Sequence, residues 1–147
     1  MEIQRYLEQI VNPTIKDLEA NPTSVRHAFL AALAVFHSID YLPRRSKSPS
    51  GLRDRFRKRC ADFAIVDRIA HAFKHVEAGS DHNPDHQPLS AKGVIARSPA
   101  YYNKSGAYGL SRWNDPIGGV TLDSERHIDV LSAVKGAAEF VRLQIGP

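Results

Sequence analysis

Apolar residues recur at helical spacing through most of the chain, and this pattern predicts four helices. The first covers residues 3–18, where Asn12-Pro13 predicts either a kink or a division into two short helices. The second, residues 25–42, is apolar on nearly every side and follows Ser24, a candidate N-cap. We therefore expect the second helix to be buried at the centre of the fold.

The third predicted helix, residues 52–77, has two kinds of surface. Placed at 100° per residue, its apolar side chains form one broad stripe, made of Leu52, Phe56, Cys60, Phe63, Val66, Ala70 and Phe73. A narrow arc beside the stripe carries Arg53, Arg57, Arg68, His71 and His75. The stripe is expected to face the core, which leaves the row of arginines and histidines as the most informative feature of the sequence.

The helical period disappears between residues 79 and 122, where ten of the chain's 18 glycines and prolines fall. Residues 92–97 and 119–122 have the character of short strands, so they predict a small β-hairpin. A last amphipathic helix follows Asp123-Ser124. The predicted fold is all-α: a single domain, residues 1–147, built as a four-helix bundle with an irregular, hairpin-containing insertion at 79–122 between helices three and four.

Length and composition agree with one ordinary globular domain. The chain has 147 residues, of which 42% are hydrophobic and 24% charged. Its longest apolar run, residues 28–36, is too short to span a bilayer. Cys60 is the lone cysteine, and the first residues have no pattern of a secretory signal. We expect a cytoplasmic protein without a disulfide.

The net charge of +4 is concentrated in one window. Residues 44–59 contain eight basic side chains and one acid, whereas the rest of the chain has 12 basic and 15 acidic residues. Such a patch attracts polyanions, because each phosphate that it neutralises releases a counterion. The candidate nucleic-acid contacts are Arg44, Arg45, Arg53, Arg57 and Lys58. The alternative is a solvated connection that leads into a helix.

Arg68, His71 and His75 suit chemistry on a phosphodiester. Residues three, four and seven apart share a helical face, so the three side chains can converge on one small group. An arginine holds phosphate and a histidine moves a proton near neutral pH, and RNA supplies its own nucleophile, the 2′-hydroxyl. Asp40 is a candidate for orienting a catalytic histidine. The alternative is a polar seam that serves packing alone.

Arg68-Ile-Ala-His-Ala-Phe-Lys-His75 resembles the motif of the HEPN family, in which an arginine is followed after six residues by a histidine. That family comprises small α-helical proteins, many of them metal-independent ribonucleases and others non-catalytic nucleotide-binding proteins. The resemblance implies that Arg68 and His75 form the active-site pair, assembled across a homodimer. It also implies RNA or a nucleotide as the partner and no cofactor.

Two alternatives belong to other classes of protein. His71 and His75 have the i, i+4 spacing of a helical zinc pair, and further ligands could come from residues 81–86 or from His37 with Asp40. We expect no metal there, because the Arg68 cation disfavours a second positive centre. The other alternative is a non-catalytic interaction module that uses the basic patch together with the aromatic residues of the insertion.

Overall fold

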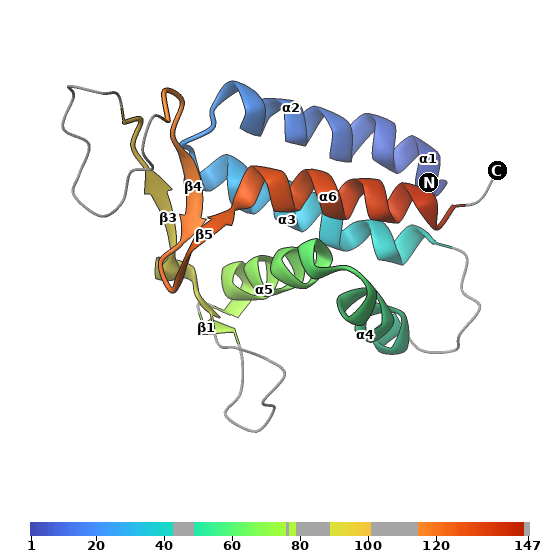
Figure 1. Cartoon of the computed structure of the whole chain (residues 1–147). Helices are drawn as coiled ribbons and strands as arrows, with labels where there is room; N and C mark the ends of the chain where they lie inside the picture. Colours follow the sequence, from blue (N-terminus) through green and yellow to red (C-terminus); the bar gives the residue numbers. More distant parts are fainter. Residues whose placement is uncertain (43–48, 76, 79–88, 101–114, 146–147) are drawn as a thin grey trace.

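The computed structural model describes residues 1–42, 49–75, 77–78, 89–100 and 115–145. This part of the chain is mostly helical, with five helices and a small antiparallel sheet of three strands. In Figure 1 the helices lie side by side, and the sheet stands at one end of them. The all-α expectation therefore holds in its coarse form, whereas a four-helix bundle is not confirmed.

The first helix is continuous through Pro13. It consists of α1 (Ile3–Tyr6), a π-helical turn η1 (Leu7–Val11) and α2 (Asn12–Ala20). In the π turn the backbone N–H of Asn12 donates to the carbonyl of Leu7, five residues back. The wider π turn accommodates a proline that lacks an N–H, so the helix continues through Pro13 without dividing.

The remaining helices pack against one another around α3 (Val25–His37), which continues as the 3-10 turn η2 (Ser38–Tyr41). Ser24 caps α3 by accepting a hydrogen bond from the backbone N–H of His27, as its position predicted. The other three are α4 (Pro49–Arg59), α5 (Ala61–His75) and α6 (Val130–Leu143). Helix α5 packs on both α3 and α6, and α4 packs on α5. No helix in the described ranges is long and apolar enough to cross a membrane.

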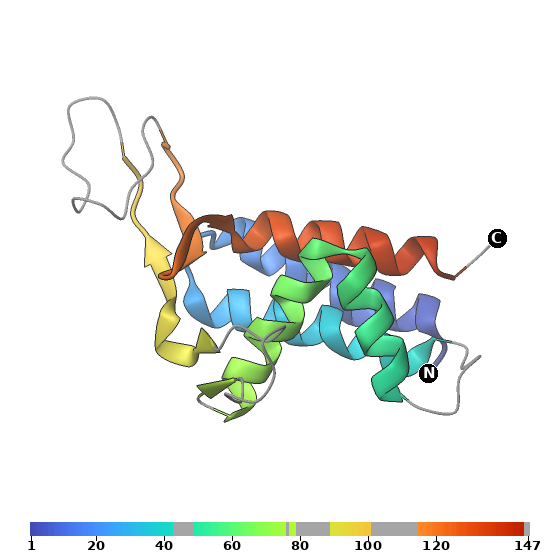
Figure 2. The same ribbon diagram turned by 60° about the horizontal axis from the view of Figure 1, so that its bottom comes forward.

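Strands β3 (Val94–Arg97), β4 (Gly119–Leu122) and β5 (Glu125–Asp129) form the three-stranded sheet, in that order. The pairing of β3 with β4 confirms the predicted hairpin. A short second pair, β1 (Glu77–Ala78) with β2 (Leu89–Ser90), and the 3-10 turn η3 (Ala91–Gly93) precede it. Figure 2 shows the sheet turned so that β3 and β4 extend away from the helices.

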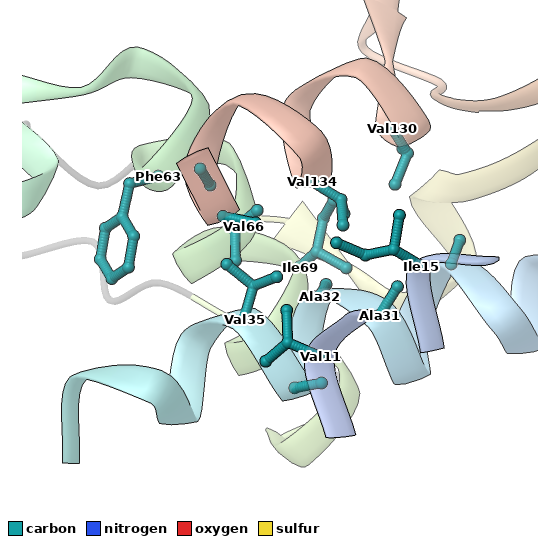
Figure 3. Packing of buried hydrophobic residues seen from close by; sticks show 14 of the residues in the cluster. Val11, Ile15, Ala31, Ala32, Val35, Phe63, Val66, Ile69, Val130 and Val134 are labelled. Atoms are coloured by element: carbon teal, nitrogen blue, oxygen red, sulfur yellow. The ribbon is translucent and has the colours of Figure 1, made fainter. Parts of the chain in front are cut away.

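The core is apolar and draws on every long helix. Figure 3 shows its centre, where Val11 and Ile15 meet side chains of α3, α5 and α6. Its fully buried residues include Val35, Phe63, Val66, Ile69 and Val134. Burying such side chains is the main favourable contribution to folding. The apolar stripe predicted for helix three is wrong at Phe73, whose side chain is 52% exposed. Its ring packs at a tilt against that of Phe29.

The expected single helix over residues 52–77 is wrong: the chain breaks at Cys60 into α4 and α5. The break lets Phe56 of α4 pack edge-on against Phe63 of α5 and Phe140 of α6, at ring-centroid distances of 5.3 and 5.0 Å. The Cys60 thiol accepts a hydrogen bond from the backbone N–H of Phe63 and thereby caps α5. Basic residues end α4 and Asp62 begins α5, which suits the dipoles of two separate helices.

The last helix begins later than expected, because residues 125–129 form β5 before it. Asp129 caps α6 by accepting from the backbone N–H of Ser132, so the expected start at Asp123-Ser124 is wrong. β5 lacks the strict alternation of a half-buried strand, which is why the sequence pattern did not reveal it. The Thr121 hydroxyl secures β5: it lies 2.6 Å from the Ile128 carbonyl oxygen and 3.1 Å from that of Arg126, and the two carbonyl groups share its single proton.

A largely buried ion-pair cluster lies at the loop end of the β3–β4 hairpin, where Arg97 pairs with Gly119. The Arg97 guanidinium contacts the carboxylate of Asp115 at 2.9 Å and that of Asp129 at 3.5 Å. Burial raises the pKa of Asp115, but hydrogen bonds from the Gly118 N–H, Arg97 and the Ile117 N–H outweigh it and hold the pKa below its ordinary value. Gly118 has φ 75°, and a Cβ there would lie 2.4 Å from the Arg97 carbonyl oxygen, so this turn requires glycine.

Candidate nucleic-acid interface

Asp67 of α5 is the centre of a polar cluster on the inner side of α4. Its side chain is 3% exposed, and a carboxylate so deeply buried needs cationic partners. The partners come from α4: the Arg53 Nε lies 3.1 Å from Oδ1, and the Arg57 Nε lies 3.4 Å from Oδ2. Together with His71, these residues are called the Asp67 cluster below.

Arg53, Phe56 and Arg57 share the inner face of α4, because they are three and four residues apart. Phe56 anchors this face in the core, and the two arginines on either side of it reach the Asp67 carboxylate. Three members of the predicted row, Arg53, Arg57 and His71, therefore come together from two helices instead of lying along one. Breaking the helix at Cys60 brings Arg53 and Arg57 onto α5, where Asp67 neutralises part of their charge.

His71 is held at both ring nitrogens. Its Nδ1 lies 2.8 Å from the Asp67 backbone carbonyl and 3.5 Å from the Asp67 carboxylate, and its Nε2 lies 3.2 Å from the Arg53 Nη1. A guanidinium can only donate, so Nε2 accepts from Arg53 and the ring proton sits on Nδ1. The structure thus places an imidazole next to a guanidinium, two groups that can act on a phosphodiester.

The outer face of α4 carries exposed positive charge. Arg55, Lys58 and Arg59 are exposed, and this set is called the α4 cationic face. Arg59 lies over the Phe140 ring at 5.8 Å. Arg44 and Arg45, also expected to contact nucleic acid, lie outside the described residues. Of the predicted nucleic-acid contacts in the described ranges, Arg53 and Arg57 belong to the Asp67 cluster, and Lys58 points to solvent beside it.

Arg68 lies apart from the Asp67 cluster. Its Nη2 is 2.7 Å from the Glu125 carboxylate of β5, and its side chain is largely buried. Position 75 lies on the same helical face as Arg68, seven residues later, but the His75 side chain is outside what the structure describes. The geometry of the predicted Arg68–His75 pair therefore stays a prediction, and Glu125 is a partner of Arg68 that the sequence pattern did not suggest.

Asp40 pairs with His37 at the end of α3, with 3.1 Å between Oδ2 and the His37 Nδ1. Both side chains are about half exposed. Asp40 thus contacts His37, and the role predicted for it, orienting a catalytic histidine, stays a prediction. Phe36 links the two histidines, because its ring meets His37 edge-on at 5.2 Å and His71 at 5.3 Å.

The metal alternative gains no support from the described residues. Among them, no three histidine, cysteine, aspartate or glutamate side chains come close enough together to hold a metal ion. The histidine-rich residues 81–86 and the His75 side chain fall outside this description. Where the structure does describe His71, its neighbours include a guanidinium, which opposes a metal cation electrostatically.

Asp67 is the residue of the candidate site that sequence reasoning missed. The available signal was an acid in the middle of a helix whose neighbours at three and four residues are Phe63, Ala64, Ala70 and His71, with no acid or permanent cation among them. A carboxylate in such surroundings is buried only when it is paired. The hypothesis of a single long helix hid its partners, because Arg53 and Arg57 would then lie about four and about three turns away along the same helix.

No protein-family model matches this chain, and comparison with curated proteins and with solved structures finds no significant match either. The site is therefore interpreted from its own chemistry. It consists of two anchored guanidinium groups, an imidazole and three exposed cations on one short helix.

Proposed function

We propose that this protein binds RNA through the α4 cationic face and the Asp67 cluster. The observation that supports the proposal best is that Asp67 fixes Arg53 and Arg57 against α5 while Arg55, Lys58 and Arg59 stay exposed on the same helix. Phosphate contacts of this kind supply most of the affinity for a nucleic-acid backbone. The HEPN resemblance and the homodimer that it implies stay predictions.

The first prediction concerns the α4 cationic face. We expect Arg55→Ala/Lys58→Ala to weaken binding of a fluorescein-labelled single-stranded RNA and to reduce the salt dependence of binding. The slope of log affinity against log salt should fall by about 1.4, since each phosphate contact contributes about 0.7 on single strands. Fluorescence anisotropy across a salt series measures both. Both side chains are exposed on α4, so the fold should survive.

The matched control is Lys16→Ala/Lys92→Ala, which removes two exposed cations from α2 and η3, away from α4. It should bind RNA with nearly the affinity and salt slope of the natural chain. Equal losses in the two double variants would mean that net charge alone, and not the α4 cationic face, drives binding. An absence of binding by the natural chain would overturn the proposed function.

A second candidate function is metal-independent cleavage of RNA. The geometry of His71 favours it, because the Asp67 carbonyl fixes the ring through Nδ1 and Arg53 lies at Nε2, where a phosphate would need a cation. In this proposal Arg53 shifts from the His71 Nε2 to the phosphate when RNA binds. Nε2 then takes the proton of the attacking 2′-hydroxyl, and the guanidinium stabilises the charge on the phosphate. Arg68 and His75, the pair that the HEPN resemblance implies, are the competing assignment.

The second prediction separates these assignments. If His71 acts on RNA, cleavage in the presence of a chelator should fall at least about 100-fold in His71→Gln, the usual contribution of general acid–base catalysis. His127→Gln, at an exposed position of β5, should cleave normally. Loss of cleavage in Arg68→Ala and His75→Ala but not in His71→Gln would assign the reaction to the competing pair. Gel analysis of a labelled RNA gives the rates.

A further inference from the structure

Three rings form a continuous row beside the Asp67 cluster. The Phe36 ring lies between those of His37 and His71 and meets each edge-on, at interplanar angles of 75° and 89°. The His37 side chain, at the outer end, is 53% exposed, and Phe36 is partly buried. We call His37, Phe36 and His71 the aromatic row. It runs from the C-terminal end of α3, which carries Phe36 and His37, to His71 on α5.

The inner end of the aromatic row carries a fixed cation. Arg53 contacts His71 through Nη1 and Asp67 through Nε, so its guanidinium is held at two of its three nitrogens. Within the described part of the chain the third nitrogen, Nη2, has no hydrogen-bond or ion-pair partner. The side chain is 27% exposed, so an anion can approach it from solvent. An immobilised guanidinium loses little entropy when it binds phosphate.

The outer end of the row is also held in place. Asp40 contacts the His37 Nδ1 at 3.1 Å and thereby restricts the rotation of the ring. Neighbouring ring centres are 5.2 and 5.3 Å apart, so a short stretch of extended strand can reach from Arg53 to His37. Aromatic surfaces beside a cationic groove are how proteins hold single strands, because every base has a face that can stack.

We propose that Arg53 and the aromatic row form a nucleotide subsite for single-stranded RNA. The Arg53 guanidinium binds a backbone phosphate, and a base of the same strand stacks on the exposed ring of His37, which Phe36 supports. This inference rests on the proposed RNA binding and makes it more specific: the α4 cationic face attracts any polyanion, whereas the subsite requires an unpaired base. Asp40 is a positioning residue for His37 in this arrangement.

The test compares two RNA strands of equal length and charge, one of adenylate residues and one whose riboses carry no base. The natural chain should bind the adenylate strand about tenfold more tightly, since stacking of one base contributes on the order of 1–3 kcal/mol. Phe36→Leu and His37→Ala should each reduce this ratio toward one and leave the affinity for the abasic strand unchanged. An unchanged abasic affinity also shows that the variant is folded.

Phe73→Leu is the matched control, because Phe73 is an exposed phenylalanine of α5 that belongs to the Phe29 contact and not to the aromatic row. It should keep the full preference for adenylate. Equal affinity of the natural chain for both strands overturns the subsite but leaves RNA binding by the α4 cationic face intact. Failure to bind either strand overturns the proposed function itself.

Photochemical crosslinking locates the base directly. An RNA that contains 4-thiouridine, irradiated in complex with the natural chain, should crosslink to the peptide that contains Phe36 and His37, as read by mass spectrometry. The yield on that peptide should fall in Phe36→Leu. Crosslinks confined to other parts of the chain would overturn the placement of the base.

Discussion

We expect Asp67→Ala to lower the free energy of unfolding by about 3 kcal/mol, the low end of the cost of breaking a buried ion pair. Without the carboxylate, the positive charges of Arg53 and Arg57 face each other in a poorly solvated site between α4 and α5. The low end applies because Arg53 is partly exposed and can turn its charge toward water. Urea unfolding followed by circular dichroism measures the change.

Asp54→Ala is the control for this prediction. Asp54 also lies near Arg57, at 3.8 Å, but its side chain is 60% exposed. Exposed pairs of this kind contribute little, so the variant should stay within about 0.5 kcal/mol of the natural chain. If the two variants were equally destabilised, burial of Asp67 would not be what makes the cluster important.

The other large effect is a loss of stability at alkaline pH through Tyr6. The pKa of Tyr6 is raised from 10.0 to about 12. Burial is the largest cause, and the negative charges of ionised Tyr41 and of Asp40 add to it. A folded-state pKa above the unfolded one means that this contribution is complete below pH 10 and is lost as the pH rises through about 12. Two pKa units correspond to about 3 kcal/mol.

Tyr6→Phe isolates that contribution. The variant loses the hydrogen bond from the Tyr6 hydroxyl to the Ala34 carbonyl, which costs about 1 kcal/mol near neutral pH. It keeps the ring stacked on Tyr41, whose centroid is 4.2 Å away. Between pH 10 and 12 the stability difference between the natural chain and the variant should therefore shrink and change sign. A constant difference over that range, measured by chemical denaturation, would contradict the assignment to Tyr6.

The helical pattern was predictable because it is local. The period of apolar residues predicted which faces of α3 and α6 are buried, and Ser24 predicted where α3 begins. The hairpin of β3 and β4 also followed from short apolar runs bounded by turn residues. In the first helix, however, the pattern predicted an interruption at Pro13, which a π turn avoids.

The candidate site was predictable in its residue types but not in its arrangement. The sequence singled out Arg53, Arg57 and His71, and the structure brings these three together. The sequence did not show that Asp67 lies at their centre. A helix break without proline or glycine leaves no strong mark in the pattern of apolar residues. The clearest available sign was the change from basic residues before Cys60 to Asp62 after it.

The sequence by itself determined that this is a helical protein with an apolar central helix, a hairpin before the last helix and one concentrated basic segment. Only the tertiary structure decided which cations meet which carboxylates. Burying Phe56 between Phe63 and Phe140 folds α4 back on α5, and this packing places Arg53 and Arg57 at Asp67 and separates Arg68, which pairs with Glu125. Contacts between residues distant in sequence follow from how apolar faces pack, and a local period does not record that packing.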